Sequence, residues 1–308
     1  MHEALRLAVD ELRPLRDPVL IAAFAGFTDP TGAAVATVRH LEEQWSATPL
    51  ASIDPERFFD FTVQRPVVRM VEGERVLEWP ENRIAVARPP GVDRDFLLLI
   101  GVEPHMRWRT FLAAIEEVLR ATGSTMSVTL GAQASAVPHT RPLPVTLSSS
   151  ATEFEAMFGM QAPASRYQGP TGIAGVLNLR TRALGWKNAS LWAMLPHYLN
   201  AGPNPNAAIA LAGLIDRAFG THTPLGALEE RARVYAEQVR ETLAAAPDGA
   251  AYVRQLEEQY DALRPQLPPG SVVPPATLEE PPSAEDGLPD APDLLDDLDE
   301  FLRGQRGT

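Results

Sequence analysis

Ten residues in loops next to predicted strands and helices could bind a small molecule. Histidine and carboxylate side chains can transfer protons or hold a divalent ion, and arginine can bind an anion. A glycine-rich turn before a helix can bind phosphate through its backbone amides. We predict that the ligand-binding residues are Asp29, Glu103, His105, Arg107, His139, Arg141, Thr171, Gly172, His197 and Asn204.

The three loop histidines could form a metal site only with a carboxylate such as Glu103 or Asp29 beside them. No H-E-x-x-H or similar short ligand spacing occurs around His105, His139 or His197. Loop histidines that bond to backbone groups are far commoner than metal ligands. We therefore predict no metal and no cofactor.

The turn at residues 169–175 is the strongest candidate for an anion cradle, because a helix is predicted to start near Ile173. Thr171 is expected to cap that helix. Arg107, Arg109 and Arg141 could bind the same anion. Salt links to neighbouring acidic residues explain Arg107 and Arg109 equally well.

Nucleophilic and nucleotide-dependent catalysis have little support in the sequence. The chain has no cysteine, and Lys187 is its single lysine. Ser135 lacks the glycine two residues before it that a nucleophile elbow needs. Neither a P-loop nor G-x-G-x-x-G is present. No catalytic residue is assigned.

Strands and helices alternate over residues 18–215, which predicts an α/β fold with a parallel or mixed sheet. Ligands bind beyond the carboxyl ends of the strands in such sheets, so the candidate loops should share one edge. The predicted strands are 18–25, a hairpin within 67–79, 83–88, 96–100, 125–130, 143–148 and 189–195. The predicted helices are 33–45, 107–122, 149–158, 173–184 and 205–219.

The C-terminal part differs in composition. Residues 1–220 are predicted to form the α/β core domain, and 221–264 a helical appendage with helices at 225–246 and 248–264. Residues 265–292 contain nine prolines and no basic residue, which predicts a disordered linker. Residues 293–303 have the spacing of a short acidic amphipathic helix. Its expected partner-binding residues are Leu294, Leu295, Leu298, Phe301 and Leu302.

Charge and hydropathy exclude two classes of partner. The net charge is −13, of which residues 265–308 carry −8, and no stretch forms a basic stripe. Nucleic-acid binding is therefore not expected. No apolar run is long enough to span a membrane and no signal peptide is recognised, so we predict a cytoplasmic protein.

Six motifs occur in order: GFTDPTGAA, RP…EWP, GVEPHMRW, VPHTRP, YQGPTGIAGVL and SLWAMLPHYLNAGPNPNAA. Over about residues 5–265 they resemble the bacterial, actinobacterial-type branch of the proteasome assembly chaperone 2 family. The resemblance implies a three-layer α/β/α sandwich similar to phosphorylase/hydrolase-like folds. It also implies homo-oligomers, often trimers. The hydrophobic–Tyr–any-residue motif by which relatives contact the proteasome is not found at Arg306-Gly307-Thr308.

Two functional hypotheses follow. The first is a non-enzymatic, oligomeric assembly or binding protein with proteasome components as candidate partners. The second is a small-molecule binding protein or enzyme that uses the strand-end loops for a nucleoside or phosphate.

Overall fold

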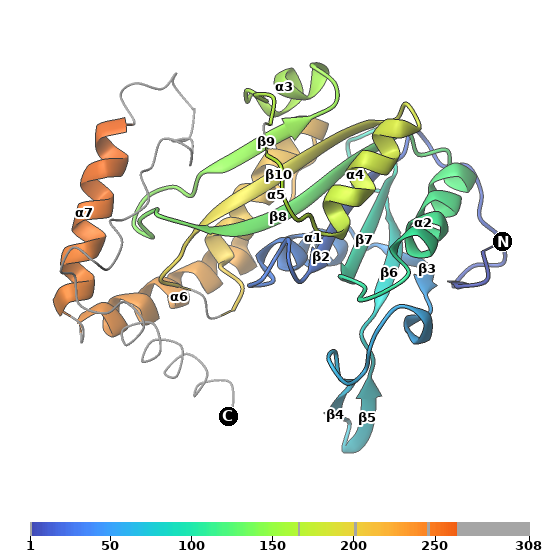
Figure 1. The fold of residues 1–308 in the computed structure, drawn as a ribbon, viewed down its shortest axis with the longest axis horizontal. Coiled ribbons are helices and arrows are strands. Elements are labelled where there is room, and N and C mark those ends of the chain that lie inside the picture. Colours follow the sequence, from blue (N-terminus) through green and yellow to red (C-terminus); the bar gives the residue numbers. More distant parts are fainter. Residues whose placement is uncertain (1, 166, 200–201, 245–246, 264–308) are drawn as a thin grey trace.

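The computed structural model describes residues 2–165, 167–199, 202–244 and 247–263 (Figure 1). The predicted linker and the predicted acidic helix lie outside the described residues. So do the five proposed partner-binding residues, Leu294, Leu295, Leu298, Phe301 and Leu302.

An eight-stranded mixed sheet forms the centre of the molecule, in the order β1-β3-β6-β7-β2-β8-β10-β9. The four adjacent strands β7, β2, β8 and β10 are parallel, and the flanking strands pair antiparallel. The bounds are β1 Leu5–Leu7, β2 Val19–Ala25, β3 Thr48–Ile53, β6 Asn82–Ala87, β7 Phe96–Val102, β8 Met126–Ser135, β9 Val145–Ser149 and β10 Lys187–Pro196.

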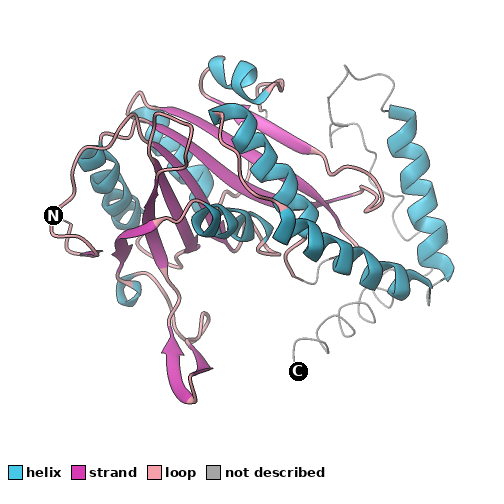
Figure 2. Ribbon diagram, turned by 180° about the vertical axis from the view of Figure 1, so that it is seen from behind, coloured by secondary structure: helices cyan, strands magenta, loops and turns pink. Residues whose placement is uncertain are grey.

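Helices cover both faces of the sheet, which confirms the predicted three-layer α/β/α sandwich (Figure 2). One hydrophobic cluster joins α1, α3 and α5 to the sheet, and a second joins α2 and α4 to it. The bounds are α1 Ala33–Gln44, α2 Trp108–Thr122, α3 Glu153–Phe158, α4 Ile173–Ala183, α5 Pro205–Phe219, α6 Gly226–Ala244 and α7 Pro247–Leu263, with a 3-10 turn at Pro55–Arg57. None of the described helices has the length and apolar character needed to cross a bilayer.

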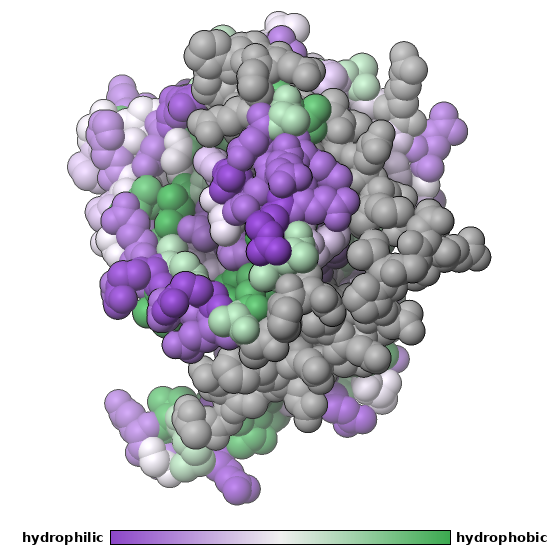
Figure 3. Space-filling model, turned by 90° about the vertical axis from the view of Figure 1, so that its left-hand side faces the viewer, coloured by the Kyte–Doolittle hydropathy of each residue, from purple (hydrophilic) through white to green (hydrophobic). Residues whose placement is uncertain are grey.

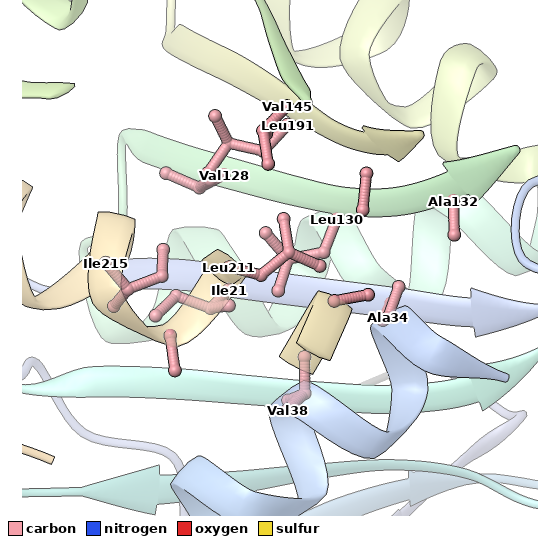
Figure 4. Close-up of a cluster of buried hydrophobic side chains, with 14 of the residues drawn as sticks. Ile21, Ala34, Val38, Val128, Leu130, Ala132, Val145, Leu191, Leu211 and Ile215 are labelled. Atoms are coloured by element: carbon pink, nitrogen blue, oxygen red, sulfur yellow. The ribbon is translucent and has the colours of Figure 1, made fainter. Parts of the chain in front are cut away.

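Small residues on α1 and α5 let these helices pack closely against the central strands. Ala34 and Val38 of α1, together with Leu211 of α5, meet Ile21 of β2 and Leu130 of β8 (Figure 4). All five side chains are buried. Because β2 is covered on both faces, its sequence is a continuous apolar run.

A two-stranded hairpin projects from the sandwich (Figure 1). It consists of β4 Val67–Val71 and β5 Glu74–Glu78, and it is called the arm below. Glu72 and Gly73 form its turn, both with positive φ. The Gly-centred hairpin predicted from the sequence is thus confirmed.

Four elements differ from the sequence prediction. Strands β1 and β3 were not predicted, because β1 has three residues and Pro49 interrupts the β3 pattern, where the pairing with β6 shifts register. The segment 131–135, predicted as a loop, continues β8 because β10 pairs with it up to Ser135. The short helix α3 begins at Glu153 rather than at 149, because β9 runs to Ser149.

The predicted C-terminal helical pair is present as α6 and α7, which extend beyond one end of the sheet (Figure 1). Val239 of α6 and Leu256 of α7 form a small cluster with Tyr198 and Leu199, which follow β10. The division into a domain at 1–220 and an appendage at 221–264 stays a prediction.

Gly101 of β7 should tolerate no side chain. A Cβ there would lie 1.8 Å from Oδ1 and 2.8 Å from Cγ of the buried Asn82, and 3.0 Å from a ring carbon of Phe24. We expect Gly101→Ala to lower the free energy of unfolding by about 2 kcal/mol, because neither neighbour has room to move. Urea denaturation measures it.

Gly213→Ala is the matched control for this prediction. Gly213 lies inside α5, with no atom within 4 Å of an added Cβ. The control should raise the free energy of unfolding by about 0.5–1 kcal/mol. Equal effects at the two positions would contradict the proposed clash.

Candidate functional site

The predicted loops lie along one edge of the sheet, which is called the rim below. Strands β2, β7, β8 and β10 are parallel, so the segments 26–32, 103–107, 136–144 and 197–204 all leave from the same edge. Helix α4 leads back to the start of β10, so its N-terminus also lies there. Gly172, the residue before α4, packs against the loops after β2 and β7. A Cβ added to it would lie only 2.6 Å from Thr28 and 2.7 Å from Glu103.

Asp29 lies three residues before Gly32, the N-cap residue of helix α1, and its side chain accepts a hydrogen bond from the first turn of that helix. Its Oδ2 accepts a hydrogen bond of 2.8 Å from the amide of Val35, and the residue is 1% exposed. Its other oxygen, Oδ1, has no hydrogen-bond partner among the described residues. Burial raises the pKa of Asp29 to about 6, and amides of the first helical turn oppose that rise. Asp29, one of the ten predicted ligand-binding residues, thus bonds to the first turn of α1.

Glu103 performs the corresponding role for helix α4. Its Oε2 accepts a 2.7 Å hydrogen bond from the amide of Ile173. The prediction that Thr171 caps this helix is wrong, because the N-cap residue is Gly172 and no local side chain accepts there. A carboxylate from a distant loop occupies the place, which local sequence spacing could not reveal. The anion cradle expected at 169–175 therefore has an internal carboxylate at its first helical amide.

His105 joins the loop after β7 to the segment that leads into the arm. Its Nδ1 accepts a 3.0 Å hydrogen bond from the amide of Asp60, and its ring lies edge-to-face against Phe59 at 5.6 Å. The next residue but one, Arg107, is exposed, has a φ of 56° and forms the N-cap position of α2. His105 is thus some way along the rim from the other two loop histidines, which share a different cluster.

The rings of His139 and His197 both lie edge-to-face against the ring of Tyr198, at 5.9 Å and 5.5 Å. The Tyr198 hydroxyl accepts a 2.9 Å bond from the backbone amide of His139 and lies 2.9 Å from its Nδ1. His197 contacts Ser135 O through Nδ1 at 3.2 Å and the Tyr252 hydroxyl through Nε2 at 3.2 Å. Burial lowers the pKa of His139, which favours the neutral imidazole, and the Nδ1 of that form can accept a hydrogen bond from the Tyr198 hydroxyl.

Arg141 anchors helix α7 instead of remaining available for an anion. Its guanidinium bonds Asp261 at 2.7 Å and Glu257 at 3.2 Å. Nearby, the hydroxyl of Tyr260 donates to Pro142 O at 2.8 Å. Asn204 likewise has a structural bond, because its Oδ1 accepts from the amide of Asn206 at the start of α5.

The ten predicted residues therefore share an edge but form separate groups. Asp29, Glu103, Thr171 and Gly172 lie around the starts of α1 and α4. His139, Arg141 and His197 lie under α7. Among the residues that the structure describes, no three His, Asp or Glu side chains are placed to hold a metal.

Residues that the sequence patterns did not predict complete these groups. Tyr198, Tyr252, Glu257 and Asp261 hold the histidine and arginine side chains, and Asp60 holds His105. One signal was available for Tyr198, because it directly follows His197 after an apolar strand. The α7 residues gave none, since their partners are between 55 and 120 positions away.

The raised pKa of Asp29 predicts a pH-dependent stability difference. The folded protein binds the proton more tightly than the unfolded chain, so this stabilisation is complete below the ordinary value of 3.8 and is lost as pH rises through about 6. Asp29→Asn removes the titration. We expect the wild-type free energy of unfolding, relative to that of the variant, to fall by up to about 3 kcal/mol between pH 3.5 and pH 7. Urea denaturation of both proteins measures it; a constant difference would contradict the assignment.

The PAC2 family model matches residues 23–243. A PAC2 family protein from Streptomyces avermitilis is 38% identical over 77% of this chain and 100% of its own, with a TM-score of 0.69. A search of curated proteins finds no match.

Two further solved structures are similar. A proteasome-assembly chaperone homologue from Mycobacterium tuberculosis is 41% identical over 76% of this chain and 99% of its own, with a TM-score of 0.68. An archaeal proteasome activator from Pyrococcus furiosus shares the fold, with 17% identity over 78% of this chain and 98% of its own and a TM-score of 0.64. The family match spans most of the strands and helices described above, including α1 and α4, whose first turns bond to Asp29 and Glu103. The chain therefore belongs to the PAC2 family.

Proposed function

We propose that this protein is a non-enzymatic, oligomeric assembly or binding protein of the proteasome-assembly chaperone type. Its site of action is the cytoplasm, and its candidate partners are proteasome components. The observation that carries the proposal is the 41% identity to the M. tuberculosis proteasome-assembly chaperone homologue, which aligns over 99% of its length.

The chemistry of the rim supports a binding role. Asp29 and Glu103 bond to helix amides, and Arg141 bonds to α7. Groups engaged in this way position loops, whereas a catalytic acid, base or anion site needs groups that face a substrate. The exposed apolar side chains of the arm add the kind of surface that macromolecules bind.

The partner-binding residues of the C-terminal segment remain part of this proposal. Leu298 and Phe301 would insert into an apolar groove of the partner while the neighbouring acidic residues stay in solvent.

Retention of proteasome core particles tests this function. The tagged full chain should retain purified core particles on a resin, and a chain ending at residue 264 should retain less. Leu298→Asp with Phe301→Asp should match the truncation, because the two changes remove the apolar side chains and keep the tail's length. Absence of core particle from the full-chain sample would refute the proposed partner.

The alternative is a protein that binds a nucleoside or phosphate at the rim. The convergence of the loops favours it, as does the Oδ1 of Asp29, which has no hydrogen-bond partner in the described part of the chain. The carboxylate of Glu103 disfavours it, because this group already takes the first amide of α4 and would repel an anion.

A thermal-shift screen of nucleosides and phosphorylated metabolites separates the two functions. A ligand at 100 times its Kd would add about 2.7 kcal/mol of apparent stability, which is a shift of at least several degrees for a chain of this size. We expect no shift above about 1 °C in any sample. A reproducible shift of several degrees with one compound would restore the alternative.

A further inference from the structure

Helix α7 packs over the loops after β8 and β10 and covers that end of the rim. Val253, Leu256 and Tyr260 of α7 are buried and recur at helical spacing. Figure 3 looks onto this end of the molecule and shows hydrophilic side chains gathered at the centre of its surface. The family match ends at residue 243, before α7 begins, so α7 lies outside that match.

A cluster of histidine and tyrosine rings lies between α7 and these loops. Its members are His139 after β8, His197 and Tyr198 after β10, Tyr235 of α6 and Tyr252 of α7. The ring of Tyr198 lies edge-to-face against His139 at 5.9 Å and against Tyr252 at 6.2 Å. Tyr198 thus joins the loop after β8 to α7.

The hydroxyl of Tyr198 requires a neutral His139. A phenol has one proton to donate, and its oxygen already accepts the amide N–H of His139 at 2.9 Å. In the described part of the chain, the Nδ1 of His139, also at 2.9 Å, is the acceptor within reach of that proton. Nδ1 must therefore be unprotonated, which fixes both the charge and the tautomer of the ring.

Protonation of His139 breaks this pairing. The Nδ1 of an imidazolium carries a hydrogen, so it and the backbone amide would both donate to the Tyr198 oxygen. The Tyr198 proton would then lose its acceptor in a residue that is 8% exposed, and a buried donor without a partner is costly. Burial accordingly lowers the pKa of His139, although the charge of Glu257 acts in the opposite direction.

His197 responds differently to a proton. Its Nδ1 faces the carbonyl of Ser135 at 3.2 Å, and a carbonyl only accepts, so Nδ1 carries a hydrogen in both charge states. Its Nε2 accepts from the Tyr252 hydroxyl when neutral and donates to the same oxygen when charged. Tyr252 is half-buried, so its proton can turn to solvent. Protonation of His197 therefore leaves both of its bonds in place.

The other charged and titratable groups that face His139 keep their charge state near neutral pH. Arg141 of the same loop stays charged in its ion pairs with Glu257 and Asp261. Burial raises the pKa values of the three tyrosines of the cluster, so they stay uncharged. His139 is thus the group whose charge decides the hydrogen bonding of the cluster.

We propose that His139 is a proton-sensitive switch, which holds α7 on the rim while it is neutral and releases α7 when it is protonated. Two contacts couple the switch to the helix. Tyr198 packs on Tyr252 of α7. Thr140 and Arg141, which directly follow His139, bond to acidic residues of α7. Release uncovers the loops after β8 and β10, at the edge where open α/β sheets bind their ligands.

The accessibility of single introduced cysteines tests the switch, because the chain contains none. Val253→Cys places a thiol on the buried side of α7, and Arg254→Cys places one on the exposed side of the same helix. The labelling rate of the first divided by that of the second reports the released fraction, because the pH dependence of the thiol reaction cancels. The reagent is 4,4′-dithiodipyridine, which also reacts in mild acid.

We expect this ratio to rise as pH falls below 6.5, the ordinary pKa of histidine. The docked form binds the proton less tightly than the released form, so docking is strongest above that value and weakens below it. Uptake of one proton changes the ratio by up to about tenfold per pH unit. A ratio that is constant between about pH 7.5 and about pH 5, where the carboxylates of α7 keep their charge, would overturn the proposal.

His139→Asn, introduced into both cysteine variants, identifies the group responsible. The amide oxygen of asparagine lies about where Nδ1 does and accepts from Tyr198 without titrating, so the ratio should stay low and constant. His197→Asn should keep the wild-type pH dependence. His222→Asn, at an exposed histidine, is the matched control and should also keep it. Loss of the pH dependence in His197→Asn, or its survival in His139→Asn, would each refute the assignment.

NMR of the wild-type histidine rings tests the same switch without a change at His139. The midpoint of the His139 titration should coincide with the midpoint of the labelling ratio and lie below 6.5. A His139 ring that titrates at or above that value, or a ratio that changes in a different pH range, would contradict the switch. Circular dichroism at both ends of the pH range checks that each labelled variant is folded.

Discussion

Parallel pairing of β7, β2, β8 and β10 is the constraint on which the rest of the structure depends. Four adjacent strands that run in one direction must send their connections across the faces of the sheet and return them at the opposite edge. Every loop that follows these strands is thereby placed on the rim. Helices α1, α2 and α5 begin there, as does α4, so the rim gathers unpaired amides as well as side chains.

Carboxylates from the loops of the rim accept hydrogen bonds from some of these unpaired amides. Asp29 and Glu103 accept from amides of α1 and α4, and burial of Asp29 raises its pKa against this favourable contact. The arrangement fixes loop positions and reduces the capacity of the helix ends to hold an external anion. The side chains that remain exposed at this edge are mixed, with the apolar Phe27 and Met106 beside the polar His105 and Arg107.

Sequence patterns predicted the parts of the fold that depend on local physics. Continuous apolar runs identified the buried strands, and the glycine at position 73 identified the hairpin. Contacts between distant segments could not be predicted in this way. The pairing of β1 with β3, the cap from Glu103 and the bonds of Arg141 to α7 join residues between about 45 and 120 positions apart. The sequence therefore identified the rim, while the partners of its side chains required coordinates.

The position of α7 makes the two ends of the rim physically different. At one end Arg141, Tyr252 and Tyr260 tie α7 over the loops after β8 and β10, so their polar groups are covered within the chain. At the other end the arm leaves the body beside His105 and is covered by none of the described residues. A single chain thus covers one end of its rim by itself, while at the other end the apolar side chains of the arm stay exposed. This asymmetry follows from where the chain places its extra elements, because α7 packs over one end and the arm projects from the other.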